Sequence, residues 1–182
     1  MTQTTQRLLE PIAEFGSVEA SLAFAQLEDL TRRLWALVES ADAKELAWQP
    51  APGMNTIGML IAHIAIAEVY WGSELTQKAF ICEQVIGIGP DDDGMPLAES
   101  APPPPNLAGK SLPYYHDLVM RAREHTRTVL EPLADDDLTR LLERRSPKGT
   151  RVLNGRWILF HMVEHLGGHL GQIGLLRHLH RA

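Results

Sequence analysis

The sequence contains little cysteine and no long apolar run, and each of these absences excludes a class of protein. A single cysteine, Cys82, excludes a small fold held together by disulfides. No uncharged apolar run reaches about 18 residues, so no membrane-spanning helix and no membrane partner are expected. The first residues show no basic stretch followed by an apolar one, so we expect no signal peptide and a cytoplasmic protein.

Positive charge is also in short supply. The formal net charge is −6, whereas a protein that binds duplex nucleic acid normally has a basic face, so no nucleic-acid partner is expected. With 45% hydrophobic and 22% charged residues in 182, the chain has the composition of a folded domain with a core. We therefore expect residues 1–182 to form a single domain.

The alternation typical of β-strands is nearly absent, whereas a period of 3.6 residues is strong in four segments. These amphipathic segments cover residues 17–41, 57–80, 111–131 and 155–180. Four long helices, two of them joined by a long connection, predict an all-α fold in the form of a four-helix bundle.

The long connection joins the second and third predicted helices and is rich in proline and glycine. Nothing periodic occurs between residues 87 and 110, and the acidic run at 91–93 is expected to be a solvated part of this loop. Between the third and fourth helices, residues 135–142 are expected to form a short helix or turn, and residues 146–150 a tight turn.

Histidine is concentrated at the end of the chain, where residues 155–182 contain five of the eight. Three of them form a ladder, His161, His165 and His169, with four residues per step. Such a step drifts by only about 40° around a helix, so His165 and His169 stack one turn apart on the apolar face. Two imidazoles in this arrangement can bind one metal ion.

His63 is the third candidate ligand, because it shares the inward face of the second helix with Leu60 and Ala67. Three inward imidazoles from two helices predict a divalent metal site, and such a donor set suits zinc, nickel, copper or iron(II). Three protein ligands leave positions open, as in catalytic sites. Backbone carbonyls or water are the alternative partners for buried histidines.

Other residues could serve the same site. Gln172 lies about 20° from His165 around the helix, and Tyr70 shares the face of His63, so each either orients a bound ligand or packs at the edge of the core. The segment from His161 to His165 also matches H-x-x-E-H, the inverted zinc-protease pattern, with Glu164 as the base. Cys82 has no C-x-x-C partner, and both a reactive and an inert thiol remain open.

Glycine is frequent in the last helix, at positions 167, 168, 171 and 174. Each costs about 1 kcal/mol relative to alanine in a helix interior, so some gain should offset it. Close approach of another helix or of a ligand is such a gain. Packing between two copies of the chain would fit, and we expect a homodimer.

Two segments resemble the DinB/YfiT-like superfamily. WQPAPGMNTIGMLIAHIAIAEVYW, which contains His63, is similar to the second-helix region of that family. GRWILFHMVEHLGGHLGQIGLLRHL, which contains His165 and His169, is similar to its last helix. Two positions depart from the pattern: Gly168 stands where many members have a further histidine, and Leu170 where many have arginine.

The resemblance implies a four-helix bundle, often dimeric, with a divalent metal (zinc or nickel) on His63, His165 and His169. Many members resemble transferases that use a low-molecular-weight thiol such as mycothiol, bacillithiol or glutathione, and others metal-dependent hydrolases. We therefore expect a metal-dependent enzyme that activates a thiol, or water, for attack on a small electrophile. The alternative is a non-catalytic stress or binding protein that is stabilised by its metal.

Overall fold

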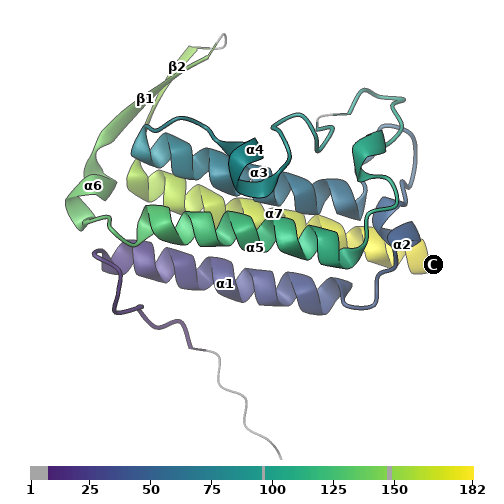
Figure 1. Ribbon diagram of the computed structural model, residues 1–182, viewed down its shortest axis with the longest axis horizontal. Helices are drawn as coiled ribbons and strands as arrows, with labels where there is room; N and C mark the ends of the chain where they lie inside the picture. Colours follow the sequence, from purple (N-terminus) through teal and green to yellow (C-terminus); the bar gives the residue numbers. More distant parts are fainter. Residues whose placement is uncertain (1–7, 96, 147–148) are drawn as a thin grey trace, which may run out of the picture.

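Four long helices lie side by side and form the body of the molecule (Figure 1). The structure is a computed structural model that describes residues 8–95, 97–146 and 149–182. The long helices are α1 (Val18–Val38), α3 (Ile57–Thr76), α5 (Leu112–Leu130) and α7 (Gly155–Arg181). Helix α3 packs on α5 and α7, and α1 packs on α7. The predicted all-α four-helix bundle is confirmed.

Side-chain caps set the first turn of three of these helices. Ser17, Thr56 and Asn154 accept hydrogen bonds from the backbone N–H groups three residues ahead, at 3.2, 3.1 and 2.9 Å. Helix α3 ends earlier than predicted, at Thr76, because Gln77 adopts a left-handed conformation with φ of 55°. The caps therefore fix where the inward face of α3 begins, and with it the position of His63.

Short elements complete the connections. The predicted long connection is confirmed, and it contains α4 (Cys82–Ile86), which packs on α3 and α5, and the 3₁₀ turn η1 (Pro105–Leu107). Helix α2 (Ala43–Ala47), which was not predicted, follows α1, and α6 (Asp135–Thr139) is the expected short helix.

A β-hairpin between α6 and α7 was not predicted and extends beyond the bundle (Figure 1). Strands β1 (Leu141–Ser146) and β2 (Gly149–Asn154) are antiparallel, with Leu142 opposite Leu153. The expected tight turn at 146–150 falls partly on residues 147 and 148, which lie outside the described residues. Leu142 belongs to the core, so the hairpin is held by its leucine pair rather than by a long apolar strand.

Two arginine–glutamate pairs cross the apolar interior. Arg123 of α5 donates to both carboxylate oxygens of Glu68 on α3, at 2.7 and 3.0 Å, and also to Glu28 on α1. Arg177 of α7 donates to Glu45 on α2 at 2.6 and 3.2 Å. A guanidinium forms two parallel hydrogen bonds with a carboxylate in one plane. These pairs therefore restrict how the helices that carry them pack against one another.

The four glycines between residues 167 and 174 of α7 do not serve packing inside the chain. A Cβ atom added at Gly167, Gly168 or Gly171 would meet nothing within 4 Å, and one at Gly174 would meet only Leu37, at 3.8 Å. Within the described residues, none of the helices combines the length and hydropathy that crossing a bilayer requires.

Two of the ion pairs of α7 allow a matched test of how burial affects the contribution of an ion pair to stability. Arg177–Glu45 and Arg156–Glu19 both have a closest N–O distance of 2.6 Å, but the first pair is buried and the second is exposed. Arg177→Ala leaves the Glu45 carboxylate buried without its partner, and we expect a loss of about 3–5 kcal/mol in the free energy of unfolding. Arg156→Ala should cause a much smaller loss. Equal losses for the two variants in urea titrations would contradict the prediction that the buried pair contributes more to the free energy of unfolding.

Candidate metal centre

Three histidine rings meet between α3 and α7. The Nε2 atom of His165 lies 3.0 Å from Nε2 of His63 and 3.0 Å from Nε2 of His169. The ligand atoms of all three lie within 4.8 Å of one another. Nitrogens at about 2.0–2.1 Å from one zinc ion are separated by about 3 Å when the angle at the ion is near 90°. The structure thus brings together the three histidines that the sequence singles out, at a spacing that could hold one ion.

Hydrogen bonds on the outer side of two rings decide which nitrogen faces inward. His63 donates from Nδ1 to Asp93 Oδ2 at 2.8 Å, and His169 donates from Nδ1 to Gln172 Oε1 at 2.8 Å. With its proton on Nδ1, a neutral imidazole presents a lone pair at Nε2. His63 and His169 therefore both direct lone pairs at His165.

Hydrogen bonds among the three rings cannot satisfy both of these lone pairs. The neutral His165 ring has at most one proton on Nε2, and it can donate that proton to only one of the two lone pairs that face it. A cation at the centre accepts a lone pair from every ring. The donor set thus fits a metal ion better than it fits a hydrogen-bonded histidine cluster.

Burial keeps two of these rings, those of His165 and His169, neutral. It lowers the pKa of His165 to about 3, and the neighbouring His169 and His63 act in the same direction. Burial also lowers the pKa of His169. At neutral pH the imidazoles therefore keep their lone pairs available, which is the state that binds metal.

Asp93 is a site residue that the sequence analysis missed. The run at 91–93 was expected to be solvated, but Asp93 is only 2% exposed and holds His63 through Oδ2. Its other oxygen accepts a hydrogen bond from the Met95 N–H at 2.8 Å, so the carboxylate is anchored on both sides. Nothing in the spacing of the sequence signals this contact, because the two residues lie thirty positions apart and Asp93 belongs to an aperiodic loop.

A pocket of about 250 Å³ opens beside the rings. Its walls come from α3, the loop after it and α7, and they are mostly apolar and aromatic. The lining includes His63 and His165 together with Ile66, Ala67, Tyr70, Trp71, Phe80, Pro90, Asp93, Met95 and His161. Tyr70, one of the two weaker candidates, thus lies in the wall of this pocket, whereas Gln172 contacts His169.

His161 and Glu164 do not join the cluster. The His161 ring stacks on Trp157, with centroids 4.8 Å apart and planes 12° apart, and meets the edge of Trp71. Its Nδ1 lies 3.3 Å from the exposed Glu164 carboxylate. The inverted protease pattern is therefore not assembled, because His161 packs against the two tryptophans, with its ring centroid 5.8 Å from that of His165, and its nitrogens are not part of the three-histidine cluster.

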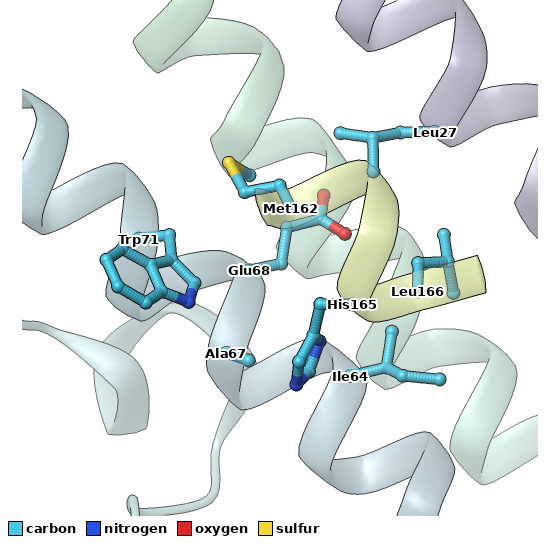
Figure 2. A pocket seen from close by; sticks show the side chains of 8 residues that line it. All are labelled: Leu27, Ile64, Ala67, Glu68, Trp71, Met162, His165 and Leu166. Carbon is cyan, nitrogen blue, oxygen red and sulfur yellow. The ribbon is translucent and has the colours of Figure 1, made fainter. Parts of the chain in front are cut away.

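Glu68 lies behind the centre and belongs to the core. Figure 2 shows its carboxylate pointing away from the His165 ring, across a void of only about 10 Å³. Both carboxylate oxygens are bound by Arg123. This acidic residue of α3 is therefore committed to the ion pair and is not available as a ligand.

Cys82 is an inert thiol in this fold. It is buried, and burial raises its pKa to about 12, with Asp93 adding to the effect. A thiolate at this position would need a far higher pH than that of the cell. If a thiol reacts at the centre, it therefore comes from solution.

The chain matches the family model of the DinB superfamily over residues 26–173. One similar solved structure is the crystal structure of the conserved protein of locus from Enterococcus faecalis. The two chains are 16% identical with a TM-score of 0.65, and the match covers 87% of this chain and 94% of the other. At 16% identity, this similarity supports a shared fold and nothing beyond it. None of the curated proteins compared with the chain matches it.

Proposed function

The chain belongs to the DinB superfamily, and we propose that it is an enzyme whose His63, His165 and His169 hold one divalent ion, zinc or nickel. The observation that carries the proposal is the meeting of three Nε2 atoms, two of which are set as lone-pair donors by Asp93 and Gln172. Neutral imidazoles leave the full charge of the ion in place, and such an ion lowers the pKa of a bound thiol or water to near neutrality.

The open side of the centre supports an enzyme over a purely structural metal site. Within the described residues, the cluster contains three ligand groups and no fourth, and the 250 Å³ pocket reaches His63 and His165. A structural zinc site is normally closed by four protein ligands. An open position beside a pocket is what a reacting small molecule requires.

The carboxylates near the pocket favour thiol transfer over hydrolysis. Asp93 is the carboxylate in the described lining, and its oxygens are engaged by His63 and by the Met95 N–H. A hydrolase gains from a free general base, whereas a thiol that ionises on a metal attacks without one. We therefore assign attack of a low-molecular-weight thiol on a small electrophile, with metal-dependent hydrolysis as the second candidate.

We further propose that the chain acts as one domain and pairs through α7. Phe160 and Leu175 are 61% and 58% exposed, and Gly167 and Gly171 lie between them on the same side of the helix, with open space above. Small residues flanked by exposed apolar ones let two helices approach closely, and large exposed apolar surfaces mark interfaces.

The metal centre is tested by three variants with different expected losses. His165→Ala removes the central donor and should abolish stoichiometric metal, measured by elemental analysis of the purified protein. Asp93→Asn removes the charge that orients His63 and should weaken metal affinity by about 10–100-fold in a chelator competition. His161→Ala should keep the metal, because that ring faces Trp157. Equal metal loss in His161→Ala and His165→Ala would overturn the assignment.

Thiol transfer is tested by conjugation of glutathione, or of another small thiol, to a chromogenic aryl halide. The reaction should require metal, stop when a chelator removes it, and fall to background in His169→Ala. The Cys82→Ser variant should react at the parent rate, since its thiol is buried. If the protein hydrolyses esters or amides and uses no thiol, the thiol-transfer proposal is wrong and the metal-dependent hydrolase takes its place.

The α7 pairing predicts a dimer of about twice 20.3 kDa at micromolar concentration in sedimentation. Gly171→Leu places a bulky side chain where two helices would approach, and it should shift the protein toward monomer. The same substitution meets no atom of its own chain within 4 Å at Cβ, so helix content should be unchanged. A parent protein that sediments only as a monomer would rule out the pairing.

A further inference from the structure

We propose that the pocket beside the three histidines takes a substrate with a flat apolar body and a carboxylate, and that Arg144 of β1 binds this carboxylate. The inference names the substrate class for the site assigned above, and in that respect it rests on the proposed function. Three independent features carry it: the aromatic wall, the position of the Arg144 guanidinium, and the charge pairing in the hairpin.

The wall of the pocket consists largely of ring faces and edges. Tyr70 and Phe80 meet edge-on, with centroids 5.4 Å apart, and Trp71 and His161 meet edge-on at 4.8 Å. Aromatic rings favour offset or edge-to-face packing with other flat rings. A volume of about 250 Å³ suits a body of one or two rings rather than a long chain.

Arg144 is not one of the residues that line the pocket, but it brings a positive charge to two of the rings that do. Its guanidinium carbon lies 5.1 Å from the centroid of the Tyr70 ring and 5.3 Å from that of Trp71. A guanidinium that rests on aromatic faces keeps N–H groups at its edge, where a carboxylate can accept two hydrogen bonds. Among the described residues, no carboxylate lies within ion-pair distance of this group.

The register of the hairpin adds a second positive charge. Arg144 lies directly opposite Arg151, two residues along each strand from the Leu142–Leu153 pair. Side chains two residues apart share a face of a strand, so the arginine pair is on the face whose leucines pack against the bundle. Like charges directly across a ladder are unfavourable, and a bound anion relieves them.

Two acidic groups near the pocket, Asp93 and Glu164, already have partners within the chain. Asp93 is bound by His63 and the Met95 N–H, and Glu164 lies next to His161. Glu74 lies near Tyr70, where it helps to raise the pKa of that phenol. The apolar wall and Arg144 together favour a ligand that is flat at one end and anionic at the other.

The test compares two probes with the same body, 2-naphthoate and 2-naphthamide, by isothermal titration calorimetry. The protein is first stripped of metal, so that the carboxylate cannot bind an ion. The parent should bind the acid about tenfold more tightly than the amide, as expected for charge-assisted hydrogen bonds. Arg144→Gln should bind both probes equally, with its affinity for the amide unchanged. Arg144→Lys, which keeps the charge but loses the fork, should retain part of the preference.

Arg156→Gln is the matched control, because it removes one exposed positive charge that is paired with Glu19, whereas Arg144 rests on two aromatic rings of the pocket wall. It should preserve the full preference for the acid, and thermal unfolding should show all variants folded. Equal binding of acid and amide by the parent, or a full preference in Arg144→Gln, overturns the inference. Because binding is measured without metal, a failure of the proposed metal and thiol chemistry would appear separately, as missing metal or missing conjugation.

Discussion

The Nε2 atom of His165 lies 3.0 Å from that of His63 and 3.0 Å from that of His169, and much of the surrounding structure holds the three rings in this arrangement. Two of the rings are oriented from outside, by Asp93 and by Gln172. The helices that carry them are clamped by buried arginine–glutamate pairs, which set α3 against α5 and α7 against α2. A small rotation of α7 would separate His165 from His63, so the fixed crossing of these helices is a precondition for the centre.

The bundle supplies the rings, but the parts outside it supply the rest of the site. The loop after α3 folds back so that Asp93 is buried against His63. The hairpin before α7 places Arg144 on the rings of Tyr70 and Trp71. In this division of roles, the helices present the three histidine rings, and the connections shape the pocket and the charge around it.

Much of the fold and part of the site could be predicted because helix geometry is local. A four-residue step puts His165 and His169 on one face whatever the rest of the chain does, and the apolar neighbours of His63 show that it points inward. Asp93 could not be found in this way, because its partner is distant in sequence and its loop has no period. The hairpin escaped notice because each strand contributes one inward leucine, Leu142 or Leu153, which is too short an alternation to stand out.

The glycines at positions 167, 168 and 171 of α7 are a sequence signal whose cause the fold of a single chain does not show. Their number in a helix signals that something approaches closely, yet the structure leaves Gly167, Gly168 and Gly171 with open space above them. The sequence by itself determined the four amphipathic helices and the inward histidines, since each depends on spacing. Only the tertiary structure decided that the nitrogens meet, that Asp93 contacts His63 and that Arg144 rests on the rings of Tyr70 and Trp71. Those are contacts between segments far apart along the chain, and no local pattern encodes their distance.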